Sequence, residues 1–217
     1  MRVWLAACGL DRVTMDAIFL SASVPIVGRG HYQETANPFL IQCAVRELVI
    51  SIIRTHRLVW GGHPSITPMI WSICEDLGVD YANSVVLYQS RYFEDRFPEE
   101  NARFDNVVFT DAVPNDQEAS LAVMRQSMLA RNDLVAAVLV GGMDGVETEL
   151  AMFQHFHPDG LVLPVAAAGG AARDIAMRFA GAEASGLDDI DFARLFHREL
   201  NVRVLQERPS GNVPRGG

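Results

Sequence analysis

The chain has 217 residues, of which 49% are apolar, and a formal net charge of −9. This length and composition predict one folded domain with a sizeable core, and the negative charge argues against nucleic acid or an anionic membrane as a partner. All 18 basic residues are arginine, which excludes a Walker phosphate loop, a Schiff-base enzyme and a lysine general base. A bound phosphate would need arginine side chains, backbone N–H groups or helix ends.

The cysteines and the lengths of the apolar runs indicate the cellular location of the protein and whether it spans a membrane. Cys8, Cys43 and Cys74 are odd in number and lack CxxC spacing, so we expect no disulfide framework, no zinc knuckle and a cytoplasmic location. No run of about 18 apolar residues is present, and no membrane span is predicted.

The domain is predicted to cover residues 16–200. A loose extension over residues 1–15 precedes it, and a polar, flexible tail over residues 201–217 follows. Translation could begin at Met1 or at Met15, which directly precedes the first convincing strand.

The first predicted strand covers residues 16–23, DAIFLSAS, and ends in small hydroxyl residues. A polar, glycine-containing loop separates it from a long helix. Asn37 is suited to cap this helix and Pro38 to occupy its first turn. The helix is apolar on most faces, which predicts that it is buried.

The second predicted strand, residues 57–62, ends in two glycines and leads into the segment GGHPSITP. Thr67 and Pro68 form an expected N-cap and first-turn pair, and apolar residues recur with helical spacing until Gly78, which ends the helix. The segment therefore predicts a strand, a glycine turn and a helix.

The same alternation continues to the end of the domain. Strands are predicted over residues 84–90 and 106–110, and Asn115 or Asp116 opens the next helix. The remaining expected elements are a strand over 133–142, a helix over 146–156, a strand over 160–167, a helix over 170–181 and a helix over 188–200. Continuous apolar strands that alternate with helices predict an α/β fold: a Rossmann-like, doubly wound, mostly parallel sheet with helices on both faces.

Polar and glycine-rich segments follow five of the predicted strands. In an open parallel sheet, ligands bind beyond the carboxyl ends of the strands, where these segments converge. Glycine pairs permit close backbone approach, and helix N-termini present N–H groups to an anion; alternatively, the glycines only form tight turns. No G-x-G-x-x-G is present, so a Rossmann dehydrogenase fits poorly. The candidate ligand-binding residues are Ser21, Ser23, Gly61, Gly62, His63, Ser65, Thr67, Arg125, Gly141, Gly142, Asp144, Gly145, Glu149, Gly169 and Gly170.

Residues 124–150, MRQSMLARNDLVAAVLVGGMDGVETEL, carry the most specific pattern. The segment resembles the signature of the Lonely Guy (LOG) family and the wider SLOG superfamily, in which an Arg/Met helix precedes a D-strand-PGG-x-GT-x-x-E segment. The resemblance extends over about residues 16–180 and is greatest to SLOG branches of bacterial conflict and antiviral systems. The matching positions are Met128, Asp133, Gly141, Gly142, Gly145 and Glu149.

Several positions depart from the LOG pattern. Val140 replaces the proline, Val146 replaces the threonine, and one residue is inserted between Gly142 and Gly145. Arg125 stands three residues before Met128, whereas the LOG arginine usually stands four before it. In LOG enzymes that arginine and the final glutamate are held to carry the chemistry.

The resemblance implies three alternative functions. The first is a module that binds or senses a nucleotide or an NAD-derived, ADP-ribose-type signal in antiviral or stress signalling. The second is a LOG-like nucleoside 5′-monophosphate phosphoribohydrolase with Glu149 and Arg125 as catalytic residues, and the third is a partner protein that has lost ligand binding. The resemblance also implies a homo-oligomer of at least two copies. A sensor could pass its signal to a separate effector protein or could act alone, and no resident cofactor is predicted.

Glu149 and Arg125 also have physical interpretations of their own. Glu149 shares a helical face with Val146 and Phe153, so it could act as a general acid or base or accept hydrogen bonds from ribose; the alternative is a glutamate favoured by the helix dipole. Arg125 lies on an apolar helical face, where it could pair with phosphate or with Glu149. The alternative for Arg125 is a surface arginine with a buried stem.

His63 could hydrogen-bond a phosphate or stack on a base, or could serve packing or capping. We interpret GGHPSITP as an anion cradle made of amides and hydroxyl groups. Tyr88, Tyr92 and Phe93 could stack on a base, although aromatic residues after a strand also belong to cores. His155 and His157 lie on different faces of a helix, and no metal site is predicted.

Overall fold

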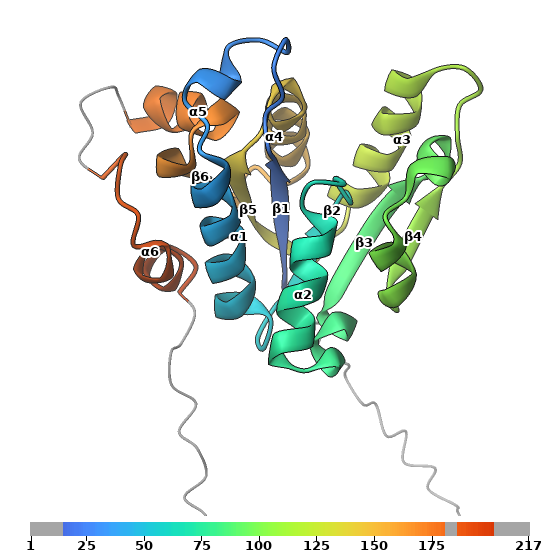
Figure 1. The fold of residues 1–217 in the computed structure, drawn as a ribbon, viewed down its shortest axis with the longest axis horizontal. Helices are drawn as coiled ribbons and strands as arrows, with labels where there is room; N and C mark the ends of the chain where they lie inside the picture. The colour runs from blue at the N-terminus through green and yellow to red at the C-terminus, as the bar shows by residue number, and fades with distance from the viewer. Residues whose placement is uncertain (1–14, 181–185, 202–217) are drawn as a thin grey trace, which may run out of the picture.

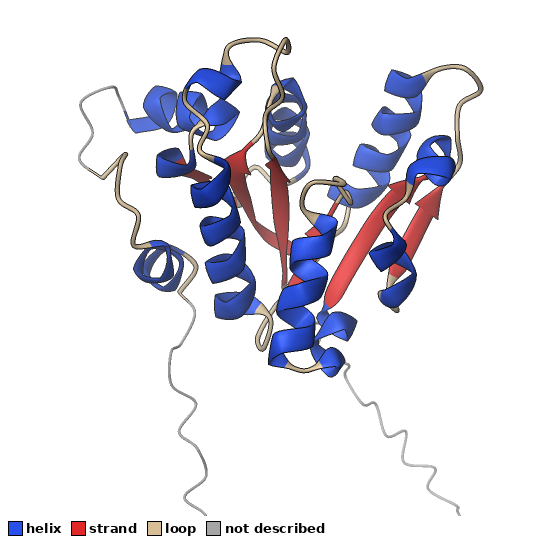
Figure 2. Ribbon diagram, in the orientation of Figure 1, coloured by secondary structure: helices blue, strands red, loops and turns tan. Residues whose placement is uncertain are grey.

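The computed structural model describes residues 15–180 and 186–201. Six strands form one sheet in the order β4-β3-β2-β1-β5-β6, and every neighbouring pair is parallel (Figures 1 and 2). The chain adds β2, β3 and β4 on one side of β1 and then places β5 and β6 on its other side. The topological switch point, where ligands bind in such sheets, therefore lies between β1 and β5. The strands are β1 (Ala17–Ser23), β2 (Arg57–Trp60), β3 (Val85–Ser90), β4 (Val107–Thr110), β5 (Leu134–Gly141) and β6 (Leu161–Val165).

Helices cover both faces of the sheet, as predicted. One face carries α1 (Pro38–Ile52) and α2 (Thr67–Leu77), and α6 (Phe192–Glu199) packs against α1. The other face carries α3 (Gln117–Leu129), α4 (Asp144–Phe156) and α5 (Gly170–Ala180). Within the described ranges, the connections contain five short 3-10 helices: η1 (Tyr32–Glu34), η2 (Val79–Ser84), η3 (Arg91–Arg96), η4 (Glu99–Arg103) and η5 (Ala166–Ala168).

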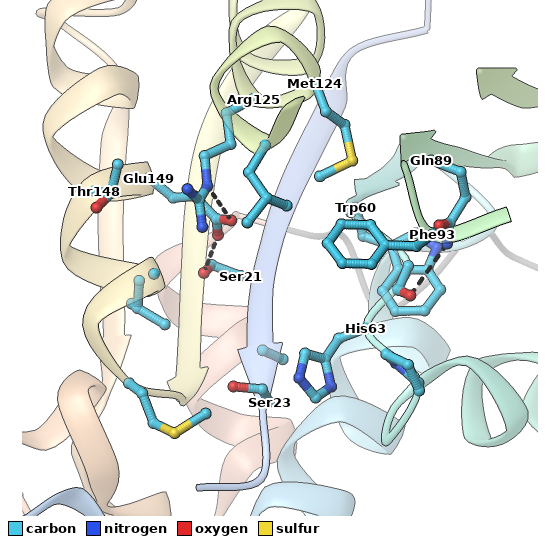
Figure 3. A pocket seen from close by; sticks show the side chains of 18 of the residues that line it. Ser21, Ser23, Trp60, His63, Gln89, Phe93, Met124, Arg125, Thr148 and Glu149 are labelled. Carbon is cyan, nitrogen blue, oxygen red and sulfur yellow. Dashed lines mark hydrogen bonds and ion pairs between the residues drawn. The ribbon is translucent and has the colours of Figure 1, made fainter. Parts of the chain in front are cut away.

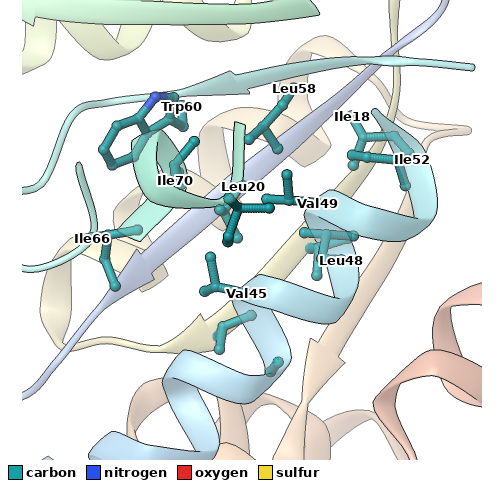
Figure 4. Close-up of a cluster of buried hydrophobic side chains, with 14 of the residues drawn as sticks. Ile18, Leu20, Val45, Leu48, Val49, Ile52, Leu58, Trp60, Ile66 and Ile70 are labelled. Atoms are coloured by element: carbon teal, nitrogen blue, oxygen red, sulfur yellow. The ribbon is translucent and has the colours of Figure 1, made fainter. Parts of the chain in front are cut away.

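The central strands are largely apolar because both of their faces are buried. On β1, Ile18 and Leu20 join the core beneath α1 and α2 (Figure 4), whereas Ala17 and Phe19 join the core beneath α3, α4 and α5. This alternation explains why an unbroken apolar run, and no polar-apolar pattern, marks each central strand.

Most helix boundaries follow from their caps. The Asn37 side chain accepts hydrogen bonds from the backbone N–H groups of Phe39 and Leu40, at 3.0 and 3.2 Å, which confirms the predicted start of α1. Asp116 accepts from the Ala119 N–H at 2.9 Å and is therefore the cap of α3. Gly78 ends α2 with a φ of +122°.

Three predicted helix starts were wrong. Helix α6 begins at Phe192, four residues after the predicted residue 188, because the Asp191 side chain caps it by accepting from the Arg194 N–H at 3.1 Å. Thr67 is the first residue of α2, and Ile66 is the N-cap; the Thr67 hydroxyl donates instead to the His63 carbonyl at 3.3 Å, because a turn over His63–Thr67 leads directly into the helix. Helix α4 begins at Asp144, two residues before the predicted Val146. The predicted extension and tail fall almost entirely outside the described residues.

Among the described residues, none of the helices combines the length and the apolar character that crossing a membrane requires.

Candidate functional site

A cavity of about 550 Å³ lies at the carboxyl ends of β1, β2 and β3 and beside the start of α4 (Figure 3). Helix α3 forms one wall and the loop after β1 contributes Arg29. This position matches the switch-point crevice of an open parallel sheet. The lining residues are Leu20, Ser21, Ala22, Ser23, Arg29, Trp60, Gly61, Gly62, His63, Pro64, Gln89, Phe93, Arg96, Phe97, Pro98, Gln117, Glu118, Leu121, Met124, Arg125, Met143, Asp144, Gly145, Val146, Thr148 and Glu149.

Glu149 occupies the centre of the cavity wall, held by residues from two other elements. The Ser21 hydroxyl of β1 donates to one carboxylate oxygen at 2.5 Å, and the Nε–H group of Arg125 donates to the other at 3.3 Å (Figure 3). The side chains of Arg125 and Glu149 are 12% and 16% exposed. Such charge-assisted bonds in a partly dry site are stronger than those between neutral groups.

Local sequence explains how this contact forms. Glu149 lies one turn after Val146 and one turn before Phe153, both of which are buried against the sheet, so its carboxylate points to the end of β1. Gly145 permits the approach of Arg125, since a Cβ atom at this position would lie 3.1 Å from an Arg125 guanidinium nitrogen. The predicted Arg125–Glu149 pair is therefore present.

The first turn of α4 carries a carboxylate that faces both the cavity and the loop after β1. The Tyr32 hydroxyl donates to the Asp144 carboxylate at 2.7 Å. This hydrogen bond, followed by burial and by nearby negative charge, raises the pKa of Tyr32 to about 12. The carboxylate also suits the positive end of the helix dipole.

The glycine turn after β2 packs closely against β3. Gly62 has a φ of +66°, and a Cβ atom there would lie 1.7 Å from the Gln89 side-chain nitrogen, which donates to the Gly62 carbonyl at 3.1 Å. Only glycine satisfies both the backbone angle and this contact.

His63, which follows this turn, is held in a defined orientation on the cavity wall (Figure 3). Its Nδ1 atom lies 2.8 Å from the Ser65 hydroxyl and accepts from the Ser65 backbone N–H at 3.3 Å. Partial burial lowers the pKa of His63 below its ordinary value, and the positive charge of Arg29 lowers it further. The ring is therefore neutral near pH 7.

The structure places the candidate ligand-binding residues in two groups. Nine of them line the cavity: Ser21, Ser23, Gly61, Gly62, His63, Arg125, Asp144, Gly145 and Glu149. The other six do not line it: Ser65, Thr67, Gly141, Gly142, Gly169 and Gly170. Ser65 contacts the cavity indirectly, through the ring of His63.

Backbone packing accounts for the four glycines in the second group. A Cβ atom on Gly141 would lie 2.6 Å from Ile41, and one on Gly169 would lie 2.0 Å from the Thr35 carbonyl. Gly170 packs on the backbone of Gly141 and Gly142. These glycines join the ends of β5 and β6 to the loop after β1.

The aromatic residues likewise divide into those that line the cavity and those that do not. Phe93 lines the cavity, as does Phe97. Tyr88 is buried in the core, where its hydroxyl accepts from Arg131 at 3.2 Å, and Tyr92 makes an edge contact with Phe93. The core alternative is therefore correct for Tyr88.

Several cavity residues were not predicted. Gln89 is a buried amide inside an otherwise apolar strand, and this exception to the apolar pattern is the signal that could have identified it. Arg29 comes from a loop and Arg96 from the short 3-10 helix η3, and the sequence pattern defines neither segment. Trp60, Met124 and Met143 resemble ordinary core residues in the sequence.

No group of three or more His, Cys, Asp or Glu side chains in the described ranges is placed to hold a metal ion. His157 is bonded to the Leu129 carbonyl at 2.7 Å, and His155 packs against Phe156.

A six-stranded parallel sheet with a polar cavity at its switch point defines a Rossmann-like α/β domain. The model of the SLOG cluster3 family matches residues 31–200. The chain therefore belongs to the SLOG cluster3 family, and this membership supports a nucleotide-related function in general. A search of curated proteins gave no match.

Proposed function

We propose that this protein binds a nucleotide or an NAD-derived small molecule, such as an ADP-ribose-type signal, and acts as a sensor in antiviral or stress signalling. The observation that carries the proposal is the cavity of about 550 Å³ at the switch point of a SLOG domain. A cavity of this size accommodates a small ligand, with few polar groups that fix its orientation.

The chemistry of the cavity walls fits the parts of a nucleotide. The Glu149 carboxylate and the Ser21 hydroxyl are suited to hydrogen-bond ribose hydroxyl groups. Phe93 and Phe97 offer aromatic surfaces on which a base can stack. The ligand would thus extend from α4 and β1 toward β3.

The second candidate function is hydrolysis of an N-glycosidic bond, and the Arg125–Glu149 pair favours it. The Glu149 carboxylate, whose Oε1 atom lies 3.3 Å from Nε of Arg125, is placed where it can stabilise positive charge at a ribose carbon or orient a water molecule. Two features favour the sensor. The carboxylate of Asp144 disfavours a substrate phosphate at the start of α4, and the buried Val146 supplies no hydroxyl there.

In this proposal the sensor works as a homo-oligomer of at least two copies and passes its state to a separate effector protein. Exposed apolar side chains support such contacts, since Ile26, Val27 and Phe39 are all exposed.

The test combines calorimetry with chromatography on the full chain. AMP, NAD, ADP-ribose and cyclic ADP-ribose are titrated into the protein, and each mixture is then analysed for released base. The sensor proposal predicts saturable binding of an intact ligand. Release of base by the wild type that disappears in Glu149→Gln would show a hydrolase and reject the sensor.

A further inference from the structure

The cavity has one side suited to an anion, and it is the His63 side. This inference rests on the proposed function, because it assigns the place of the phosphate within the same cavity. We propose that the Nε2–H group of His63 and the guanidinium group of Arg29 bind the ligand phosphate, and that the N-terminus of α4 does not.

The hydrogen bonds of Ser65 determine where the His63 ring carries its proton. The Ser65 backbone N–H donates to Nδ1 at 3.3 Å. The Ser65 hydroxyl accepts from the Val24 N–H at 3.3 Å and lies 2.8 Å from Nδ1, to which it can donate its own proton. Nδ1 is therefore an acceptor, and a neutral imidazole then carries its proton on Nε2.

The Nε2–H group is available to a ligand. His63 lines the cavity, and within the described residues no hydrogen-bond acceptor is bonded to its Nε2 atom. A donor that is fixed in direction loses little entropy when it binds an oxygen atom, so Ser65 makes His63 a preorganised phosphate contact.

Arg29 provides the charge for this site. Three arginines line the cavity, of which Arg125 is paired with Glu149 and Arg96 lies 3.7 Å from Asp95. Over residues 15–180 and 186–201, Arg29 has no carboxylate within ion-pair distance. Arg29 and His63 both line the cavity, and the positive charge of Arg29 contributes to the lowered pKa of His63.

The opposite side of the cavity repels an anion. Asp144 stands in the first turn of α4, and the Tyr32 hydroxyl donates to its carboxylate. The helix N-terminus, which would otherwise attract a phosphate, is thus occupied by a protein carboxylate. A sugar, whose hydroxyl groups donate hydrogen bonds, fits this side better.

Inorganic pyrophosphate is the probe, because it tests the phosphate site without a base. Calorimetry on the full chain is expected to show pyrophosphate binding that weakens about tenfold in Arg29→Gln, the loss of one charge-assisted contact. His63→Phe is expected to weaken it as well, whereas Asp144→Asn and the matched control Arg46→Gln, at an arginine that does not line the cavity, leave it within about twofold.

A second measurement does not depend on the folding of any variant. The ¹⁵N spectrum of His63 in the wild type should show the Nε2–H tautomer, and pyrophosphate should shift its Nε2 signal. A Nδ1–H tautomer, an unchanged Nε2 signal, or wild-type affinity in Arg29→Gln would overturn the inference. Tighter pyrophosphate binding by Asp144→Asn would also overturn it, because the phosphate would then lie at α4.

Titrations with adenosine and ADP-ribose show whether a failure concerns the phosphate site alone or the proposed function as well. Binding of either compound without pyrophosphate binding would overturn the phosphate site and retain the nucleotide cavity. Absence of binding for all nucleotide ligands and for pyrophosphate would reject both.

Discussion

Glu149 illustrates how a largely buried carboxylate is held in the wall of a cavity. Its two carboxylate oxygens accept from Ser21 and Arg125, which come from different elements. Removing one member of such a pair leaves the other charge without compensation, while removing both charges avoids this penalty. The pair is therefore a test of whether the arrangement contributes to stability as well as to binding.

We predict that Arg125→Met lowers the free energy of unfolding by about 2 kcal/mol, because the Glu149 charge loses its partner. The double variant Arg125→Met with Glu149→Gln should recover about half of that loss. Urea denaturation of the wild type, both single variants and the double variant measures the coupling. Equal stability of Arg125→Met and the double variant would show that the charge of Glu149 is not compensated by Arg125.

The lowered pKa values of His56 and His63 predict that the protein loses stability in mild acid. Burial is the main cause that lowers the pKa of each ring below its ordinary value of 6.5. Below about pH 6.5 the unfolded chain binds protons that these folded rings do not accept, so the unfolded state is favoured. Stability should then fall as the pH decreases from 6.5 through the lowered pKa values, with no contribution from these rings above about pH 7.5.

The measurement is urea denaturation at pH 7.5, 6.5 and 5.5. The double variant His56→Gln with His63→Gln should show a smaller decrease between pH 6.5 and 5.5 than the wild type. An identical decrease in both proteins would mean that other groups, such as carboxylates, determine the acid sensitivity.

At the scale of the elements, the turn from β2 to α2 is determined by one glycine. Gly62→Ala should lower the free energy of unfolding by more than about 1 kcal/mol, because it adds strain at a φ of +66° and a collision with Gln89. Gly28→Ala is the matched control, with a φ of +87° and no atom within 4 Å of an added Cβ. If thermal denaturation shows the same loss of stability in both variants, the collision with Gln89 does not destabilise Gly62→Ala.

The order and type of the elements follow from the sequence because apolar runs and helix-capping residues are both local signals. Unbroken apolar runs mark buried parallel strands, and Asn37 and Gly78 mark helix ends through their own backbone and side-chain chemistry. The start of α2 was misplaced at Thr67 because a turn initiated at His63 contributes bonds that no helix-cap pattern shows.

The site was predictable only where the sheet positions it. Ser21, Glu149 and the Gly61–His63 turn adjoin strand ends, and the topology brings strand ends together. Arg29 and Phe97 reach the cavity from loops, whose paths depend on tertiary contacts such as that of Tyr32 with Asp144. The sequence also could not separate the glycines that line the cavity from Gly169, which is required by the close approach of the Thr35 backbone.

For the whole molecule, two exposed apolar side chains, Val27 in the loop after β1 and Phe39 at the start of α1, predict self-association. Val27 and Phe39 are 86% and 69% exposed, and burial of such residues between copies is favourable. Val27→Asp with Phe39→Asp should shift the protein toward the monomer in light scattering after size exclusion. Ile190→Asp is the control, since Ile190 is 63% exposed in the segment before α6. A variant that assembles like the wild type would exclude this surface from the interface.

The central claim is that the switch-point cavity binds a nucleotide-type ligand, and ADP-ribose calorimetry tests it most directly. The wild type should give saturable heat with one site per chain, and Ser21→Ala with Glu149→Gln should weaken binding at least tenfold by removing the central contacts. Equal affinity in the wild type and this double variant, or no heat with any nucleotide ligand tested, would contradict the claim.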